Sequence, residues 1–594
     1  MSQNAPVLPV SIQSFEKLRL KNAVYVDKTQ YFPMLPNTSD VIFCSRPRRF
    51  GKTLTVRALD AYFSGEAKLF KGLAAEASMD SPDFVPHPVI SLNMSSAADS
   101  DNKEIFTENL LECLNVNAER HNLSLRYSDP GNAFSSLIKD TWKANGKKVV
   151  LLIDEYDAPV ISLVQRDKHI YDEILLSQTR GVMLRFYTQI KFSDQYLEFV
   201  FITGVTKFSR LGLFSQLNTL VDISLMPQYA AFMGYTQDEL TDNFGDFITK
   251  SAKKFKINES ELLLKLRDYY NGFSFDGDTK LYNPFSINYF FLNNKFSNYW
   301  FQSGSEKIIK KFLLEKALTV DQFQDFEVDA HFAENPGEID TASPAGFLYQ
   351  AGYLTLRSKG DGQYALDYPN LEIRQSLSSL FLQNFNDSPE NVAKAGRELV
   401  RHLATRDIPE IVNVFSKLLS GICYDDHVAA GRAAQDGSLD TVVRRAIGID
   451  FPIDAVRRLS AALAEKIIKE QGESFYRSIL HAGLWTAGAE VTPEKHENIG
   501  RLDLEAVFGG ITYVFELKMA EDVIGGPEAA RAGMAQIRDR GCGHASDRPV
   551  LVSLAIGRKE RNIVSCIFEM DGQETCVLPE RYWKYLEVHR KSSL

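Results

Sequence analysis

The chain has 594 residues, too many for one hydrophobic core, so we expect three to five structural units. Its formal net charge of -10 excludes a generally basic nucleic-acid coat protein, so any nucleic-acid site must be a local patch. The six cysteines include no C-x-x-C pair, and no apolar run is long enough to span a bilayer, which predicts a soluble, cytoplasmic protein without a membrane segment.

Residues 1–225 alternate short apolar runs with longer helical stretches, a pattern typical of a parallel α/β sheet. Buried parallel strands read as continuous apolar runs. Four such runs are expected to be strands: 40–45, 87–94, 148–156 and 197–205. We therefore predict a P-loop NTPase-type sheet with helices over this first domain.

The remainder of the chain is predicted to contain three further regions. Residues 226–380 carry short helices and aromatic-rich turns, which indicate a mostly helical or winged-helix lid whose aromatic side chains form its core. Residues 381–470 are expected to be a helical connector with a break at 429–440, rich in small residues. Residues 471–594 contain a compact helix–strand–strand–helix–strand series, which predicts a C-terminal α/β domain.

The stretch SRPRRFGKT is similar to the phosphate-loop pattern G-x-x-x-x-G-K-[ST], except that Arg46 replaces the first glycine. An apolar strand precedes it, and an amphipathic helix is expected to begin at Lys52, directing free N–H groups at phosphates. Lys52 would reach the β- and γ-phosphates, and the Thr53 hydroxyl would ligate Mg²⁺. Arg48 and Arg49 are either solvated charges or bring positive charge to the phosphates or to a partner of the loaded state.

A P-loop enzyme needs a second carboxylate at the end of a neighbouring strand, and KVVLLIDEYDAP supplies it. Asp154 suits the magnesium shell, and Glu155 suits orientation of the attacking water. Asp157 can either cap the next segment or touch the metal. Thr203 and Thr206, at the end of a later strand, are placed where a γ-phosphate sensor would sit, and Arg210 is a further candidate sensor.

A second candidate site lies in GRLDLEAVFGGITYVFELK, where two alternating strands are joined by a Gly-Gly pair typical of a tight hairpin. In that register Asp503 faces Glu516, and Lys518 lies on the same face, opposite an apolar face. Facing carboxylates destabilise a hairpin, and Mg²⁺ between them would remove the penalty. The alternative is a surface hairpin in which Lys518 pairs with Glu516 and Arg501 with Asp503. Glu505, on the same face, fits a solvated or outer group.

Together YVDKTQYFPML, SRPRRFGKT, LLIDEYDAP, LYNPFSI and QAGYLTL resemble the bacterial AAA-ATPase-like family. That family joins a divergent P-loop ATPase, with the arginine-rich loop as its usual form, to a C-terminal domain of the PD-(D/E)XK nuclease superfamily. The resemblance covers nearly the whole chain and implies Mg-ATP binding. The implied nucleotide site consists of Arg46, Arg48, Arg49, Gly51, Lys52, Thr53, Asp154 and Thr203.

The resemblance to PD-(D/E)XK nucleases implies that the C-terminal domain has a restriction-endonuclease-like fold. Asp503 and Glu516 would bind Mg²⁺, and Lys518 would position or activate the attacking water. Glu473, in the preceding helix, matches an acidic residue that adds a metal ligand in many members. Gln536, in the following helix, matches a frequent fourth element.

We therefore predict a multidomain α/β protein that is an ATP-dependent or ATP-gated nuclease using ATP and Mg²⁺. Its partner would be nucleic acid, DNA ahead of RNA, and the AAA-type resemblance adds a homo-oligomer as an expectation. Roles in phage defence or mobile-element control would be consistent with this architecture. The alternative is a nucleotide-switched interaction or signalling protein with an inert nuclease-like domain. His481 and His544 are each either a phosphate contact or a structural hydrogen-bonding group.

Overall fold

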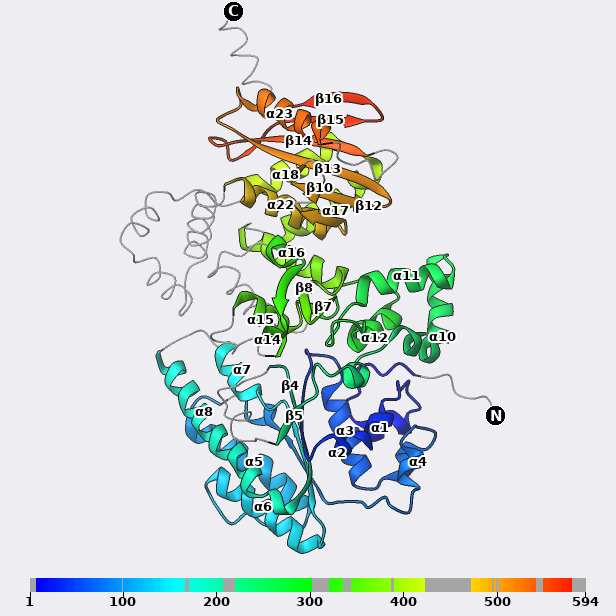
Figure 1. The fold of residues 1–594 in the computed structure, drawn as a ribbon, viewed down its shortest axis with the longest axis vertical. Coiled ribbons are helices and arrows are strands. Elements are labelled where there is room, and N and C mark those ends of the chain that lie inside the picture. Colours follow the sequence, from blue (N-terminus) through cyan, green and yellow to red (C-terminus); the bar gives the residue numbers. More distant parts are fainter. Residues whose placement is uncertain are drawn as a thin grey trace, which may run out of the picture. The chain divides into compact units, whose positions relative to one another are not determined.

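A computed structural model provides the fold of most of the chain (Figure 1). The described residues are 7–98, 100–165, 170–206, 219–301, 320–334, 343–385, 389–421, 472–493, 496–497, 500–501, 503–540 and 549–578. The chain divides into two compact units. The first comprises Met1–Ser303 and Asp325–Glu372, and the second comprises Gly304–Gln324 and Ile373–Leu594.

Five parallel strands form the sheet of the first unit, in the order β2-β3-β4-β1-β5. The strands are β1 (Val41–Ser45), β2 (Val89–Asn93), β3 (Val149–Asp154), β4 (Leu197–Gly204) and β5 (Leu220–Asp222). The four apolar runs predicted as strands are confirmed. One expectation is wrong: β4 lies between β1 and β3, so the strand that carries Asp154 is not the neighbour of the strand that leads into the phosphate loop.

Helices cover both faces of this sheet (Figure 1). One face carries α1 (Phe15–Leu20), α2 (Met34–Thr38), α3 (Lys52–Phe63) and α4 (Glu76–Met79). The other carries α5 (Lys103–Arg120), α6 (Pro130–Asn145) and α8 (Ile170–Phe192), and α7 (Ala158–Gln165) follows β3. Helix α3 packs against both β2 and β3, which brings its first turn towards the end of β3 despite the intervening strand.

The rest of the first unit is mostly helical, as predicted, and includes a small antiparallel sheet. Its helices are α10 (Gln237–Phe255), α11 (Glu259–Tyr270), α12 (Pro284–Asn293), α14 (Ala330–Glu334) and α15 (Pro344–Ala351). The sheet has the order β6-β8-β7, from β6 (Phe326–Asp329), β7 (Thr355–Gly360) and β8 (Gln363–Asp367). The aromatic motifs form a core, as expected, because Tyr282, Phe290 and Phe291 are buried among the helices.

The second unit contains a six-stranded mixed sheet, in the order β16-β15-β14-β13-β12-β9. Its strands are β9 (Glu490–Pro493), β12 (Leu504–Phe508), β13 (Ile511–Ala520), β14 (Val550–Gly557), β15 (Asn562–Met570) and β16 (Gln573–Val577), with a separate pair β10 (His496–Glu497) and β11 (Gly500–Arg501). The helices are α16 (Leu371–Phe385), which begins in the first unit, α17 (Pro389–Thr405), α18 (Ile408–Ser420), α22 (Glu473–Thr486) and α23 (Gly526–Asp539). The predicted C-terminal α/β series is present, and the sheet contains further strands that the series did not include.

The hairpin of β12 and β13 has the predicted register. Leu504 pairs with Phe515, and both turn glycines have positive φ, 57° for Gly509 and 80° for Gly510. The face of β13 that carries Glu516 is not solvated, as the surface-hairpin alternative would require, because α23 packs over it. The reason is topological: β13 and β14 are parallel, and a parallel pair requires a crossover connection, here α23.

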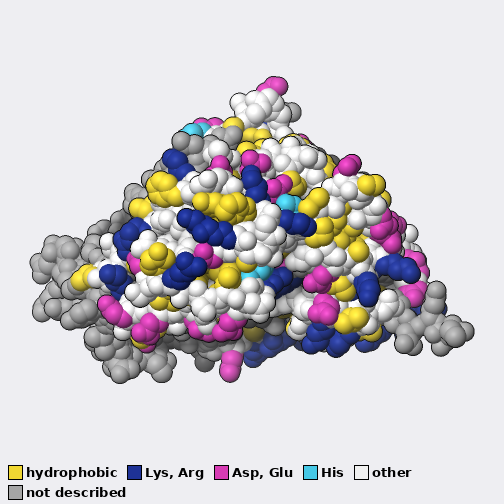
Figure 2. Space-filling model, turned by 90° about the horizontal axis from the view of Figure 1, so that it is seen from below, with side chains coloured by type: hydrophobic (Ala, Val, Ile, Leu, Met, Phe, Trp, Pro, Cys, Tyr) yellow, Lys and Arg dark blue, Asp and Glu magenta, His cyan; other side chains and the backbone are white. Residues whose placement is uncertain are grey.

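Several predicted features lie outside the described residues. These are Arg210, His544, the break at 429–440 and most of the connector up to residue 470. On the face of the molecule that Figure 2 shows, basic and acidic side chains are interspersed over most of the surface. Within the described ranges, every helix is too short or too polar to cross a membrane.

Candidate functional sites

The phosphate loop connects β1 to α3 and has the backbone that the pattern demands at its end. Gly51 precedes α3 with φ 90° and ψ 16°, a left-handed conformation that favours glycine. Space is not the constraint, since no atom lies within 4 Å of the Cβ that an alanine would add. Lys52 is 6% exposed, and its Nζ donates hydrogen bonds to the carbonyls of Arg46 (2.9 Å) and Pro47 (3.0 Å). The lysine thus folds back over its own loop.

Asp154, at the end of β3, is a buried carboxylate without a firm partner. It is 2% exposed, and neither oxygen accepts a hydrogen bond of good geometry from any described residue. Burial raises the pKa of Asp154, while the nearby Thr53 hydroxyl and Lys52 ammonium lower it in part. A hydroxyl and a carboxylate with unused oxygens are the kind of donors that Mg²⁺ prefers, so these residues fit a hydrated magnesium ion.

Glu155 follows Asp154 in a strained conformation. Its φ is 52°, which is left-handed and costly for a residue with a side chain. Strain of this kind is found preferentially at functional sites, where the surrounding structure enforces it. Glu155 also lines the large cavity described next, as do Lys52 and Thr53.

A cavity of about 760 Å³ opens next to the phosphate loop. This volume lies in the range of small-molecule and cofactor sites, and it suffices for a nucleotide. The loop side is lined by Arg48, Arg49 and residues 51–55. Another part is lined by Tyr25, Val26, Phe285, Asn288 and Tyr289. The Arg49 guanidinium lies 4.7 Å from the centre of the Phe285 ring, which joins the two parts.

Arg46 is placed differently from the other loop arginines. It is 1% exposed, and its guanidinium donates to the carbonyls of Ser45, Ser224 and Tyr229 while lying 4.0 Å from the centre of the Phe275 ring. It does not line the cavity. These contacts support the loop from beneath, and a nucleotide contact for Arg46 stays a prediction.

The polar residues at the end of β4 are also engaged within the protein. The Thr203 hydroxyl donates to the Cys44 carbonyl (2.7 Å), so it bridges two strands. The Asp157 carboxylate accepts the N–H groups of Val205 and Thr206 and the Thr206 hydroxyl (2.5 Å). Asp157 therefore ties the turn after β3 to the end of β4, which differs from both roles left open for it, the cap of the next segment and the metal contact.

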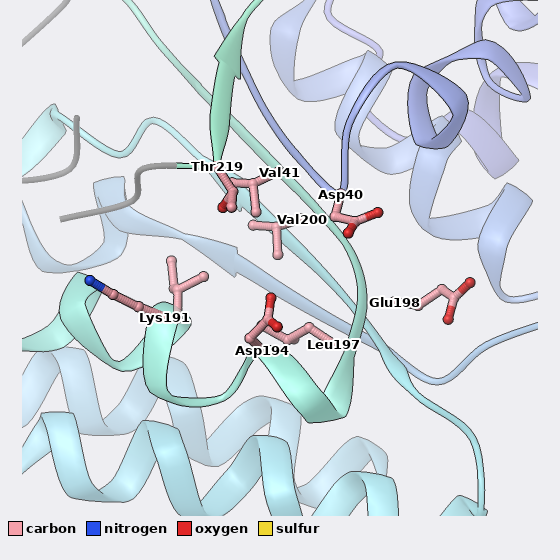
Figure 3. A pocket seen from close by; sticks show the side chains of 9 residues that line it. Asp40, Val41, Lys191, Asp194, Leu197, Glu198, Val200 and Thr219 are labelled. Atoms are coloured by element: carbon pink, nitrogen blue, oxygen red, sulfur yellow. The ribbon is translucent and has the colours of Figure 1, made fainter. Parts of the chain in front are cut away.

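A second cavity, of about 220 Å³, lies at the amino ends of strands of the same sheet, opposite the phosphate loop (Figure 3). Asp40 and Val41, at the start of β1, line it together with Leu197 and Glu198, at the start of β4. Ligands of open α/β sheets bind at the carboxyl ends of the strands. By this rule the cavity beside the phosphate loop, rather than this one, is where a nucleotide would be expected.

The second candidate site centres on Glu516, which is 1% exposed in the middle of β13. Its Oε1 accepts hydrogen bonds from Lys518 Nζ (2.8 Å) and Gln536 Nε2, and Arg540 lies 3.8 Å away. Its Oε2 is buried without a partner among the described residues. Burial and then the Asp503 charge raise the pKa of Glu516, opposed by Lys518 and Arg540. The Lys518–Glu516 pair of the surface alternative is present, but it is not on a solvated surface.

Asp503 and Glu473 complete this cluster. Asp503 Oδ2 accepts the N–H of Leu517 (2.7 Å), which holds it beside β13, and Oδ1 lies 3.9 Å from Arg477. Glu473, the first residue of α22, is half-buried. Burial, then the Asp503 charge, raises the pKa of Glu473, so these carboxyl groups are close. Arg501, the alternative partner of Asp503, has a side chain outside the described part.

This donor set fits Mg²⁺ with two protein ligands. In the described part of the chain, no three His, Cys, Asp or Glu residues form a complete metal cage. Mg²⁺ is usually held by one or two carboxylates together with water and substrate phosphate, so a cage is not required. Asp503 and the unpaired Oε2 of Glu516 meet that demand, and Glu473 as a third ligand stays a prediction.

His481 belongs to the core of the second unit. It is fully buried, and its ring contacts the Trp485 ring edge-on, with 4.2 Å between the two ring centroids. Burial lowers the pKa of His481 to about 4, so the ring is neutral near pH 7. Of its two expected roles, the phosphate contact is therefore excluded by burial, although neither ring nitrogen has a hydrogen-bond partner among the described residues.

Two residues of these sites escaped sequence reasoning. Arg477 follows Glu473 by four positions, so a shared helix face was readable from the spacing. Asn288 carried no signal, because an Asn within an aromatic motif is indistinguishable from a structural one. Its importance comes only from the cavity that it lines.

Comparison with known proteins identifies the families of both domains. Residues 9–214 match the family model described as predicted AAA-ATPase, and residues 471–564 match that of the PD-(D/E)XK nuclease superfamily. The chain joins an AAA-ATPase-like domain to a PD-(D/E)XK nuclease superfamily domain. The predicted fusion is thus confirmed, and these families generally use nucleotide and Mg²⁺.

One relative matches over nearly the full length of both chains. It is a protein of Azotobacter chroococcum mcd 1 described as an uncharacterised protein in the vnfD 5′ region. The two are 28% identical over 575 residues, which cover 95% of this chain and 99% of the relative. No solved structure matches the chain.

Proposed function

We propose that the AAA-ATPase-like domain binds and hydrolyses ATP and that the nuclease domain cleaves nucleic-acid phosphodiesters with Mg²⁺, under control of the nucleotide. One observation, made twice, carries this proposal. In each domain a lysine lies beside a buried carboxylate that has an oxygen without a partner: Lys52 beside Asp154, and Lys518 beside Glu516. Buried charges without partners are costly, and such an arrangement is kept where a cation and a phosphate complete it.

In the ATPase domain, the loop residues would act on the phosphates. Lys52 would exchange its two carbonyl partners for phosphate oxygens, and the N–H groups at the start of α3 would add to the attraction. Thr53 and Asp154 would hold Mg²⁺, which supplies charge neutralisation at the phosphates. Glu155, held in its strained conformation beside the cavity, would orient the attacking water.

The base would occupy the part of the cavity formed by Tyr25, Val26, Phe285 and Tyr289. Asn288 is 7% exposed there, and its Oδ1 accepts no hydrogen bond from the described residues. The exocyclic amine of adenine is a donor, whereas guanine presents a carbonyl oxygen at the same ring position. A small side-chain adjustment that exposes Oδ1 would therefore favour ATP over GTP, because guanine would leave the buried acceptor unpaired.

In the nuclease domain, Asp503 and Glu516 would hold Mg²⁺, which polarises the scissile phosphate. Lys518 is the group that would position the attacking water, because its Nζ lies 2.8 Å from Glu516 and its side chain is one-quarter exposed. Gln536 would keep Glu516 in place. DNA is the favoured substrate over RNA, and phage defence or mobile-element control are settings that this activity would suit.

The nuclease assignment is tested by incubating the full-length protein with Mg²⁺, ATP and linear, circular or single-stranded DNA or RNA. We expect cleavage that Asp503→Asn and Lys518→Met each abolish. Lys559→Met is the matched control, because this exposed lysine pairs with Asp522 in the same domain and should retain cleavage. Absence of cleavage of every substrate by a folded, ATP-binding protein would overturn the nuclease assignment.

That outcome would favour the alternative, a nucleotide-switched interaction or signalling protein with an inert nuclease-like domain. One observation supports this alternative: Oε1 of Glu516 is already satisfied by Lys518 and Gln536, as in a self-contained structural cluster. Under it, the same variants would leave partner binding unchanged and there would be no activity to lose.

The ATP site is tested by calorimetric titration with ATP and GTP. Lys52→Ala should abolish binding of both, whereas the exposed Lys68→Ala should not. Asn288→Leu should weaken ATP by about tenfold and erase the preference over GTP, since a buried hydrogen bond to a ligand is worth about 1–3 kcal/mol. Asn293→Leu, on the same helix but exposed, is its control. Undiminished ATP binding by Lys52→Ala would refute the loop assignment.

A further inference from the structure

We propose that Asp321 is a positioning residue of the nuclease site, acting through Arg477 on Asp503. The inference rests on the proposed Mg²⁺-dependent nuclease and adds a control element to it. Asp321 comes from a short segment within the predicted lid, and the last part of the lid and the whole connector separate it from the nuclease domain, so neither motif nor spacing points to it.

Arg477 lies between two carboxylates. Its Nη1 is 3.9 Å from Asp503 Oδ1, and its Nη2 is 3.7 Å from Asp321 Oδ2. All three side chains are largely buried, with 12–15% exposure. At such burial the interactions are weakly screened by solvent and salt, so the division of one guanidinium between two acids affects both.

Asp321 is itself anchored. It lies in the 3₁₀ turn Val320–Phe323, and its Oδ1 accepts the Ser478 hydroxyl of α22 at 2.7 Å. Three residues later the Gln324 amide donates to the Val491 carbonyl in β9 (3.0 Å). The segment is therefore held against the nuclease domain at two points, and Asp321 has a defined position from which to attract Arg477.

The charges around Arg477 leave Asp321 as the carboxylate that competes with Asp503 for the guanidinium of Arg477. Glu473 lies one helical turn before Arg477, and His481, one turn after it, is neutral because burial lowers its pKa to about 4. Lys518 is engaged by Glu516. Asp321 thus draws Arg477 away from Asp503 and leaves that carboxylate available to a cation. Without Asp321, Arg477 would close on Asp503 and compete with Mg²⁺.

The position of Asp321 in the chain makes this a route for control. Gln324 is the last residue of its segment in the second unit, and the next residue, Asp325, belongs to the first unit. There Asp325 is held by Arg357 and by Lys359 of β7. A rearrangement of the hairpin formed by β7 and β8 would therefore act on Asp325. One peptide bond joins Asp325 to the segment whose Asp321 contacts Arg477.

The experiment is calorimetric titration of the nucleotide-free, full-length protein with Mg²⁺, with Asp503→Asn defining the signal of the nuclease site. Asp321→Asn should weaken Mg²⁺ binding by about fivefold, and Arg477→Met should strengthen it, since it removes a competing cation. The double variant should behave as Arg477→Met alone, because Asp321 acts only through the arginine. Asp321→Glu should restore binding, and Asp571→Asn, an exposed acid paired with Arg406, is the control.

Nuclease assays provide a second reading: Asp321→Asn should raise the Mg²⁺ concentration for half-maximal cleavage and leave the rate at saturating Mg²⁺ unchanged. The proposal is overturned if Asp321→Asn binds Mg²⁺ like the wild type, or if the effects of the two single variants simply add. A wild-type protein without any Mg²⁺ binding that depends on Asp503 would overturn the proposed nuclease as well. Thermal unfolding of each variant distinguishes these results from loss of fold.

Discussion

Glu372 should make the first unit less stable as the pH rises through neutrality. Its carboxyl group is fully buried, and burial raises its pKa from 4.5 to about 8. The group accepts hydrogen bonds from Ser286 Oγ (2.8 Å) and the Trp300 N–H (2.7 Å), which oppose the rise only in part. Between these two pKa values the folded chain keeps a proton that the unfolded chain has lost.

The sign and size follow from linkage. Stability falls with pH wherever the folded state binds more protons than the unfolded state, here from about pH 4.5 to about pH 8, and levels off above. A difference of one pKa unit corresponds to about 1.4 kcal/mol, so the total loss across this window is at most about 5 kcal/mol. Because Glu372 has no exposed surface, solvent screening does not reduce this figure.

The assay compares wild type with Glu372→Gln by thermal unfolding at pH 5, 7 and 9, followed by Trp fluorescence. Near pH 5 the two proteins should have nearly equal stability, since both side chains are neutral and Ser286 can exchange donor and acceptor roles. At pH 9 the variant should unfold several degrees higher than wild type. Taking the difference between the proteins at each pH removes the contribution of every other titrating group.

Parallel pH profiles for the two proteins would refute the reasoning, because they would mean that Glu372 ionises normally in the folded state. The result also bears on the nucleotide site. Ser286 adjoins Phe285 in the cavity wall, and the Trp300 indole donates to the Arg48 carbonyl of the phosphate loop (3.1 Å). ATP should therefore bind more weakly to wild type at pH 9 than to Glu372→Gln.

Three further substitutions test the backbone and packing of the ATPase domain. Gly51→Ala should lower the free energy of unfolding by about 1 kcal/mol, because Gly51 has a positive φ. Gly245→Ala has equal space for a Cβ but lies in helix α10, so it should raise the free energy of unfolding. Equal effects of the two variants in chemical denaturation would contradict this reading. Gly204→Ala should cost about 3 kcal/mol, because its Cβ would lie 2.5 Å from both Asp157 Oδ1 and the Tyr156 ring, and an unchanged Tm would disprove the clash. Arg46→Lys should destabilise the domain by about 2 kcal/mol, since an ammonium cannot reproduce the planar contacts to three carbonyls and Phe275, and a stability equal to wild type would show that these contacts are dispensable.

Much of the fold was readable because strands have strict signatures. Residues 149–154 form one unbroken apolar run before their aspartate, and all six are buried in β3. The Gly-Gly pair between two alternating segments determined the register of β12 with β13, since the side-chain period of two admits no other pairing that keeps one face apolar. Those two local rules brought Asp154, Asp503 and Glu516 to the ends or faces where the structure has them.

The features that escaped prediction depend on which distant elements meet. The insertion of β4 between β1 and β3 follows from the whole topology, which no single run of residues encodes. The hydrogen bond from the Thr203 hydroxyl to the Cys44 carbonyl could not be predicted, because Cys44 comes from another strand. The contact of Arg477 with Asp321 likewise joins segments far apart in the chain.

The arginine at the start of the phosphate loop illustrates how a side chain can replace a glycine. Within residues 45–53, all of which the structure describes, positive φ angles occur at Arg49 (70°) and Gly51 (90°), so the backbone at Arg46 does not require glycine. A glycine would leave the start of the loop without side-chain contacts. Arg46 instead holds it in place with three hydrogen bonds to carbonyls and a stack on Phe275. The strained backbone of the loop is instead at Arg49, whose guanidinium contacts the Phe285 ring in the cavity wall. A phosphate loop of this kind is shaped by side-chain contacts, and under the proposed function a bound nucleotide would be coupled to the elements that those side chains touch.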